Sequence, residues 1–477
     1  MPPIDDIAID RRALLRAAVL TSAGAALPGT AFAEPMANPF LNGIHKPMTE
    51  EKTLANLKVT GTIPPSLSGR YLRIGPNPAG EINAAKAHWF LGDGMVHGIR
   101  IEGGKAVWYR NRWIRSNRVA KMTGLPAAPG AGGSVNTNVL GIGGKAWALV
   151  EAGEAPVRLS ETLESEAYDR FGGTLKGPIS AHPHLDPYAG ELHAVCYFGM
   201  NQNQLWHVAL NTDAKVIRSE PIPVQDGPSV HDCAVTPNYV LVFDLPVIFS
   251  MKRAMSGYAF PYIWNPKHQA RIGLMPRRGT AAEMVWIDVD PLYIFHAANA
   301  QETADGKILL DAIVYDSMFA ISTMGPDVNP RALERWTIDP KARRIDRAVI
   351  DKTPQEFPRI DERLTTRQHR YTYTLGLTGV ASPDQLGDGK IFRHDLNSGG
   401  RLTHDFGKTK VPGEFVFVPG DKGEDEGWLI GLVIDRNSEA TELVILDAQR
   451  FDRKPVASIR IPHRVPPGFH GNWIADG

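Results

Sequence analysis

Short apolar runs of residues, separated by turn clusters, make up most of this 477-residue chain. Within residues 108–113, even-numbered and odd-numbered side chains would face opposite sides of an extended strand. No stretch shows the sustained 3.6-residue period of a long amphipathic helix. The pattern therefore predicts an all-β fold built from strand-like runs such as VWYRNRWI, LHAVCYF, YVLVFDLPV, ILLDAIVY and WLIGLVI.

A similar turn opens several of these runs. Lys105, Lys145, Lys307 and Lys390 each follow a Gly-Gly or Asp-Gly pair, which supplies the positive φ angles of a tight hairpin. The four lysines are spaced near multiples of about 41 residues, and propeller blades repeat every 40–50 residues or so. With the chain length and the lack of long helices, this favours a seven-bladed β-propeller with a loop and helical cap over one face.

Four of the fifteen histidines lie at the ends of strand-like runs: His182, His231, His296 and His470. They are far apart in the sequence, so only a radial or barrel-like fold brings them together. In a propeller, the innermost strand of each blade starts near the axis. Four neutral imidazoles would leave a metal ion its full charge and open positions, which suits Fe(II) and O₂ better than a closed zinc site.

Composition narrows the possible functions. Hydrophobic residues make up 43% of the chain, and 52 basic residues balance 52 acidic ones. With no net charge and no basic runs interleaved with aromatics, we expect no nucleic-acid partner. Cys196 and Cys233 are the only cysteines. Both lie in apolar runs and are interpreted as small buried side chains.

The N-terminus has the pattern of an export signal. Arg11 and Arg12 precede a short stretch rich in Ala and Gly, and an Ala-x-Ala site ends at Ala33. This resembles a twin-arginine signal, and the apolar stretch is too short to span a membrane. We predict a signal peptide at 1–33, a propeller domain at 34–477 and a periplasmic or exported protein. A cytoplasmic protein with an irregular start is the alternative.

Residues 249–264 break the strand pattern, because they carry several aromatic residues and methionines and few acidic residues. One interpretation is a cap that packs on the propeller. The other is an apolar mouth that touches a membrane surface or gathers an apolar substrate.

Longer motifs run through the chain in a set order, and they include RYLRIGPNP (70–78), HWFLGDGMVHGIRI (88–101), SAHPHLDPYAGELH (180–193), VHDCAVTPNYVLVFDLPV (230–247), FHAANA (295–300), EFPRID (356–361), PGEFVFVP (412–419) and RVPPGFHGNWI (464–474). Together they resemble the carotenoid cleavage oxygenases, a family that includes lignostilbene dioxygenases. The resemblance implies a seven-bladed propeller whose axial Fe(II) is held by His182, His231, His296 and His470. It also implies cleavage of a carbon–carbon double bond by O₂, which gives two aldehydes or ketones.

The resemblance implies further residues around the iron. Glu151, Glu356 and Glu414 correspond to glutamates that orient three of the four histidines. Their apolar surroundings also predict partners, because an unpaired buried carboxylate costs roughly several kcal/mol. Thr137 corresponds to a residue whose methyl group faces the open position of the iron. His184, although only two residues from His182, is not expected to be a ligand.

Two positions bear on the substrate. Stilbene-cleaving members hold the phenol with a Lys and a Tyr where this chain has Val150 and Trp113. A buried phenol oxygen without a partner costs roughly 1–3 kcal/mol. We therefore expect a carotenoid or apocarotenoid, with a stilbene as the alternative and isomerisation as a further activity of the family. The predicted pocket contains Trp113, Val150, Phe295 and Thr137.

Other classes of propeller protein remain open at this point. Some propellers are metal-dependent hydrolases that use Ca²⁺ and carboxylates, and others are non-catalytic binding platforms. An all-histidine set argues against the first, because Ca²⁺ prefers oxygen ligands. The glutamates behind the histidines argue against the second.

Overall fold

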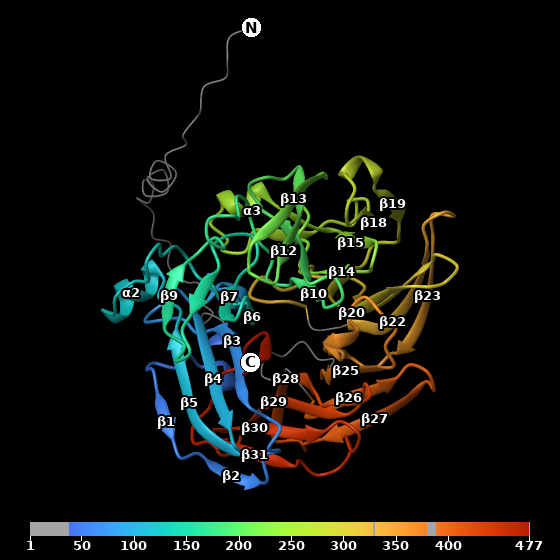
Figure 1. The fold of residues 1–477 in the computed structure, drawn as a ribbon. Helices are drawn as coiled ribbons and strands as arrows, with labels where there is room; N and C mark the ends of the chain where they lie inside the picture. Colours follow the sequence, from blue (N-terminus) through green and yellow to red (C-terminus); the bar gives the residue numbers. More distant parts are fainter. Residues whose placement is uncertain (1–37, 328–329, 379–387, 477) are drawn as a thin grey trace, which may run out of the picture. The chain divides into compact units, whose positions relative to one another are not determined.

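Seven antiparallel sheets of four or five strands are arranged around an axis in the part of the chain that the structure describes (Figure 1). The structure is a computed structural model that describes residues 38–327, 330–378 and 388–476. The predicted all-β, seven-bladed propeller is confirmed. The predicted signal peptide, residues 1–33, lies outside the described residues.

The first three blades, each given from the axis outwards, include strands from both ends of the chain. Blade I contains β32 (Gly471–Ala475), β3 (Gly69–Pro76), β4 (Gly94–Glu102), β5 (Lys105–Trp113) and β1 (Thr53–Ala55). Blade II contains β6 (Asn138–Ile142), β7 (Lys145–Leu149), β8 (Val157–Leu159) and β9 (Ser165–Tyr168). Blade III contains β10 (His184–Asp186), β11 (Glu191–Tyr197), β12 (Gln204–Asn211) and β13 (Val216–Pro223).

The remaining four blades follow in chain order. Blade IV contains β14 (Cys233–Val235), β15 (Tyr239–Asp244), β18 (Arg271–Pro276) and β19 (Val285–Asp288). Blade V contains β20 (Tyr293–Glu302), β21 (Ile308–Tyr315), β22 (Pro330–Asp339) and β23 (Arg344–Asp351). Blade VI contains β24 (Gln355–Arg359), β25 (Tyr371–Gly376), β26 (Lys390–Asp395) and β27 (Gly400–Asp405). Blade VII contains β28 (Lys410–Pro419), β29 (Gly427–Asp435), β30 (Ala440–Asp447), β31 (Ala457–Ile461) and β2 (Lys58–Gly61).

The two ends of the described chain close the ring together. The C-terminal strand β32 pairs with β3, with Asn472 opposite Leu72, and forms the axial strand of blade I. The early strand β2 pairs in turn with β31 at the outer edge of blade VII. Each seam joins strands from opposite ends of the chain, so neither blade can be completed locally. Radial repetition closed in this way leaves only short, protected sheet edges.

Apolar clusters fill the spaces between neighbouring blades. Leu72 on β3 belongs to a cluster shared by blades I and II, and Ile99 and Ile445 belong to one shared by blades I and VII. Trp336, fully buried, lies in the large cluster that includes blades IV and V. Both faces of a central strand such as β15 are therefore covered, which explains its nearly continuous apolar sequence.

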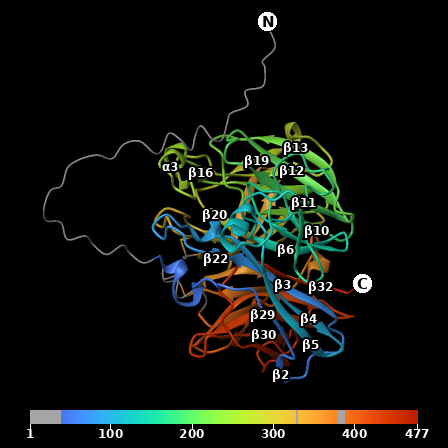
Figure 2. The ribbon, with the colours of Figure 1, turned by 90° about the vertical axis from the view of Figure 1, so that its left-hand side faces the viewer.

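A small insertion supplies part of the predicted cap. Between β15 and β18, the hairpin of β16 (Val247–Phe249) and β17 (Tyr262–Trp264) carries the short helix α3 (Met251–Met255). The Ser250 side chain caps α3 by accepting a hydrogen bond from the Arg253 N–H. In the side view, α3 and β16 lie on one side of the blades (Figure 2).

The other described helices are short. They are α2 (Asn117–Thr123) and the 3₁₀ turns η1 (Pro39–Leu41), η2 (Gly43–His45), η3 (Trp89–Leu91), η4 (Ala281–Glu283) and η5 (Glu362–Leu364). Among the residues that the structure describes, no helix combines the length and apolar character needed to cross a bilayer.

The repeated glycine turns are real, but the repeat inferred from them is wrong. Gly104, Gly144, Gly306 and Gly389 all have positive φ. However, the turn at Gly104 joins the third and fourth strands of blade I, whereas the turn at Gly144 joins the first and second strands of blade II. The turns occupy non-equivalent places because any tight hairpin needs such residues. Their spacing near 41 residues therefore does not mark the blade period.

We expect Leu72→Ala to lower the free energy of unfolding by about 2–5 kcal/mol, because it opens a cavity beside the β3–β32 seam. The measurement is the midpoint of urea unfolding. Val107→Ala is the matched control, since Val107 lies on β5 of the same blade but is 41% exposed. A Leu72→Ala midpoint equal to that of the control would contradict the structural importance of this seam.

Candidate metal centre

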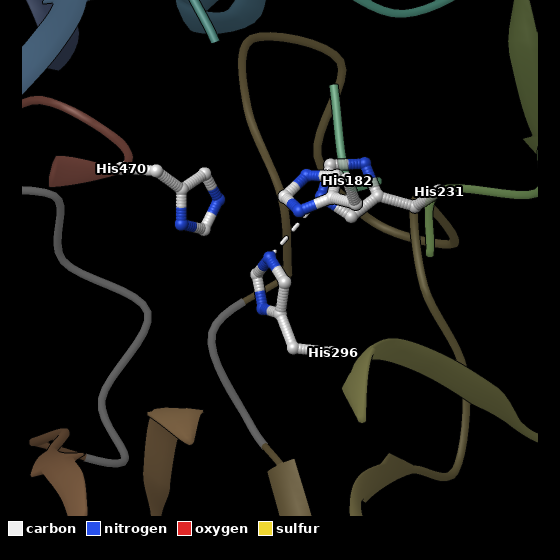
Figure 3. Close-up of side chains that lie close together, drawn as sticks. All are labelled: His182, His231, His296 and His470. Carbon is white, nitrogen blue, oxygen red and sulfur yellow. Dashed lines mark hydrogen bonds between the residues drawn. The ribbon is translucent and has the colours of Figure 1, made fainter. Parts of the chain in front are cut away.

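The four predicted histidines meet at the axis. His470 directly precedes the axial strand β32. His182 and His231 lie two residues before the axial strands β10 and β14, and His296 lies within the axial strand β20. One ring nitrogen from each of the four lies within 4.8 Å of the others, a grouping that could hold a metal ion. Figure 3 shows the four rings gathered around one small volume.

The four histidine rings lie in direct contact with one another. Nε2 of His231 lies 3.2 Å from Nε2 of His296, as the dashed line in Figure 3 marks. The His182 ring centroid lies 4.4 Å from that of His231 and 4.6 Å from that of His470. Nε2 of His182 is buried without a hydrogen-bond partner. A buried polar atom left in this state calls for a ligand, and a metal ion fits the donor set.

Each of the three predicted glutamates contacts the outer nitrogen, Nδ1, of one histidine. Glu151 lies 3.0 Å from Nδ1 of His231, and Glu356 lies 2.6 Å from Nδ1 of His296. Nδ1 of His470 lies 3.2 Å from Glu414. With Nδ1 held by a carboxylate, Nε2 is the nitrogen left free to face a metal, and its basicity increases.

Irregularities in three axial strands aim these side chains inward. The register of β20 shifts on both sides of Ala297, that of β24 shifts after Glu356, and that of β28 shifts between Pro412 and Phe415. Such β-bulges re-aim side chains and are common beside functional sites. Phe357, directly after Glu356, has a φ of +52°, which is strained for a bulky residue.

The electrostatics of the site follow from burial and from these pairs. Burial lowers the pKa of His182 well below its usual value, and the neighbouring histidines lower it further. Burial also lowers the pKa of His296, but Glu356 outweighs that effect and raises it overall. Burial raises the pKa of Glu414, whereas Arg359 and His470 bring it down to about 2. Glu414 is thus ionised, and His182 is held in the neutral form that metals bind.

The donor set narrows the choice of metal. Four imidazole nitrogens with no carboxylate among them disfavour Ca²⁺ and Mg²⁺, which bind oxygen. Imidazole suits iron, cobalt, copper, nickel and zinc. Ligands on one side of an ion, with a cavity on the other, leave coordination positions open, as catalytic metal sites require.

A cavity of about 360 Å³ opens onto this cluster. Three of the predicted pocket residues, Thr137, Val150 and Phe295, line it. Most of the aromatic residues that line the cavity are not among the predicted pocket residues, although several of them lie in the HWFLGDG motif and in residues 249–264. The aromatic lining includes Trp89, Phe90, Tyr197, Phe249, Phe260, Tyr262, Phe357 and Phe469.

The assignment of Trp113 to the pocket is wrong. Trp113 ends β5, the fourth strand from the axis in blade I. It packs with Met48, Met95 and Val119 in a separate apolar cluster, and its indole N–H donates to the Asn77 carbonyl at 2.9 Å. The alternation along β5 predicted only that alternate side chains face opposite sides of the strand. The structure buries the face that carries Trp113, but alternation could not say which space this side chain enters.

The other conspicuous histidines lie outside the cluster. His97 is buried on β4 with its Nδ1 2.9 Å from the Tyr109 hydroxyl. His88 stacks on Phe260 and accepts a hydrogen bond from the Phe90 N–H. His184, the first residue of β10, pairs with Asp232 at 2.6 Å.

Comparison with known proteins identifies relatives of this chain. Residues 45–475 match the family model described as retinal pigment epithelial membrane protein. A carotenoid cleavage oxygenase of Mycobacterium tuberculosis is 37% identical over 93% of this chain and 99% of its own length. The chain belongs to the carotenoid cleavage oxygenase family. An apocarotenoid-15,15′-oxygenase of Synechocystis is 31% identical to this oxygenase over 87% of the chain and 92% of the relative.

Solved structures agree with the fold of this oxygenase. The cobalt-substituted Synechocystis apocarotenoid oxygenase superposes with a TM-score of 0.80 at 28% identity, over 91% of this chain and 98% of the other. A lignostilbene dioxygenase of Pseudomonas brassicacearum superposes with a TM-score of 0.84 at 26% identity, over 93% of this chain and 100% of the other. The predicted enzyme class, an oxidoreductase of the dioxygenase type, is confirmed by the relatives.

We expect Glu356→Gln to weaken binding of a divalent transition-metal ion about 10-fold or more, because loss of an outer carboxylate partner typically costs 10–100-fold in metal affinity. The measurement is the cobalt(II) retained by the protein after dialysis against graded chelator. Glu81→Gln is the control, since Glu81 is exposed and has no part in the cluster. Equal retention by both variants would mean that Glu356 does not tune the metal.

Proposed function

We propose that this protein is a non-heme Fe(II) dioxygenase that cleaves a carbon–carbon double bond of a carotenoid or apocarotenoid with O₂. The observation that carries the proposal is a buried cluster of four histidines, three of them backed by glutamates, at the wall of an apolar cavity. Both oxygen atoms enter the two carbonyl products, so the reaction needs no external reductant.

In this proposal, His182, His231, His296 and His470 hold the iron, and Glu151, Glu356 and Glu414 orient three of them. Iron(II), when bound, supplies the activation of O₂ that a closed-shell alkene cannot. The chain itself supplies ligand geometry, a dry cavity and the position of the alkene.

Thr137 borders the reaction space in this proposal. It lines the cavity and is 8% exposed. Its hydroxyl donates to Oδ1 of Asn136 at 3.1 Å, and the Asn136 amide donates to the carbonyls of Phe90 and Gly92. With the hydroxyl engaged in this way, the methyl group is the part of Thr137 that suits contact with an apolar substrate.

The aromatic wall favours a polyene. Flat conjugated chains pack well against aromatic rings, and Val150 offers no hydrogen bond to a phenol. Because Trp113 lies outside the pocket, the argument against a phenol substrate rests on Val150 alone. A stilbene is the second candidate, because the lignostilbene dioxygenase superposes closely and Tyr262, a possible partner for a phenol, lines the cavity.

Aerobic incubation of the Fe(II)-loaded protein with an apocarotenal in detergent, and separately with a 4-hydroxystilbene, tests the reaction. We expect the apocarotenal to give two carbonyl products by mass spectrometry. His296→Ala, which removes one proposed ligand, is expected to lower the rate at least 100-fold.

Cleavage of the stilbene alone would replace the polyene by the second candidate. If neither compound is cut while one equivalent of iron is bound, the proposed reaction is wrong.

We also propose that residues 249–264 touch a membrane surface. Met251, Met255 and Tyr258 are 45%, 83% and 49% exposed, while Phe260 and Tyr262 of the same segment line the cavity. An exposed apolar patch at the mouth of an apolar cavity favours direct uptake of a membrane-dissolved substrate.

We expect Met255→Asp to reduce co-sedimentation with phosphatidylcholine vesicles several-fold, because a charge at this position opposes insertion of the apolar patch. Val349→Asp is the control, since Val349 is also exposed, at 45%, but lies on β23 at the outer edge of blade V. Equal sedimentation of the two variants would exclude this segment as the contact.

A further inference from the structure

His182 differs from the other three histidines of the cluster. Glutamates hold the outer nitrogens of His231, His296 and His470. Within the described residues, no carboxylate bonds to the ring of His182. Something else must therefore hold His182 in place relative to its neighbours, because a metal site requires its donors within a few tenths of an ångström.

Because the histidines come from different blades, the same question of how their relative positions are fixed applies to the whole cluster. The axial strands β10, β14 and β20 belong to three different sheets, so no backbone ladder sets their positions relative to one another. Near the axis, blades III, IV and V contact each other mainly through side chains, which permit small shifts. Ligands contributed by separate blades need polar ties that cross the blade boundaries.

Asp232 makes such ties across two boundaries at once. Its Oδ1 lies 2.6 Å from Nε2 of His184 on β10, and its Oδ2 accepts a hydrogen bond from the Ala297 N–H on β20 at 3.0 Å. Oδ1 also accepts the Cys233 N–H at 2.7 Å. The side chain of Asp232 is 2% exposed, so these bonds form where water competes little.

Every one of these contacts lies beside a histidine of the cluster. Asp232 directly follows His231, Ala297 directly follows His296, and His184 is two residues beyond His182. A second, weaker contact joins the segment of His182 to that of His231, because the Ser180 hydroxyl lies 3.5 Å from the His231 carbonyl. The carboxylate of Asp232 thus connects the backbone segments that present three of the four rings.

We infer that Asp232 and His184 are positioning residues that hold His182, His231 and His296 in register for metal binding. The inference rests on the proposed metal centre and adds to it a fourth carboxylate, which acts on the ligand-bearing segments rather than on a ligand ring. His184, too far along the strand to join the cluster, serves it through Asp232.

Cobalt(II) is the probe, because its visible absorption reports ligand geometry and its affinity can be titrated without turnover. Asp232→Asn removes the charge and keeps the shape. His184→Leu keeps the charge of Asp232 but removes the donor, whereas His184→Gln keeps an N–H near the place of Nε2. We expect Asp232→Asn and His184→Leu to bind cobalt about 10-fold more weakly, with shifted absorption bands, and His184→Gln to stay within about twofold of the wild type.

A buried Asp–His pair elsewhere provides the matched control. Asp244, with a fully buried side chain, lies 2.8 Å from Nε2 of His268 in blade IV and touches no residue of the cluster. Asp244→Asn is expected to lower the thermal unfolding midpoint like Asp232→Asn but to leave the cobalt spectrum and affinity unchanged.

The outcomes separate this inference from the proposed function. If the wild type binds cobalt and His184→Leu and Asp232→Asn match its spectrum and affinity, the pair is merely structural and the inference is overturned. If the cobalt spectrum or the cobalt affinity changes in Asp244→Asn as well, loss of stability explains the effect and the inference is overturned too. A wild type that binds no cobalt overturns the metal centre itself.

Discussion

The antiparallel pairing of β32 with β3 is the constraint on which the rest of the structure depends. It makes the last described strand the axial strand of the first blade and so places His470 opposite the other three histidines. Three histidines of the cluster, from blades III, IV and V, lie on one arc of the ring. Only closure of the ring brings in the fourth from blade I, which makes the cluster inseparable from the global fold.

The histidine cluster lies between an apolar environment and a charged one. The cavity is apolar and aromatic, whereas the shell behind the histidines carries three carboxylates that would be costly to bury alone. Each carboxylate is hydrogen-bonded to an imidazole, and Glu414 also forms an ion pair with Arg359 at 3.6 Å. Charge is thereby kept behind the histidines, and the face toward the cavity stays apolar.

The residues that hold the cluster together come from all seven blades. Glu356 on β24 and Glu414 on β28 tie blades VI and VII to the histidines, and Asn138 of blade II bonds to the Ala181 carbonyl and to Asn472. These contacts act where the sheets themselves provide no hydrogen bonds between blades. At the propeller axis the separate sheets are not joined by strand pairing, yet many chain segments converge there.

The sequence by itself determined the strand content, the four histidines, their three glutamates and the family, because these depend on local alternation and on motifs preserved in order. It did not determine where Trp113 points, how the glycine turns map onto blades, or that His184 pairs with Asp232 across two blades. Those depend on which strand lies near the axis and which side chains meet across blades. Only the tertiary structure decided them, since period-two alternation specifies a face of a strand but not the neighbour that covers it.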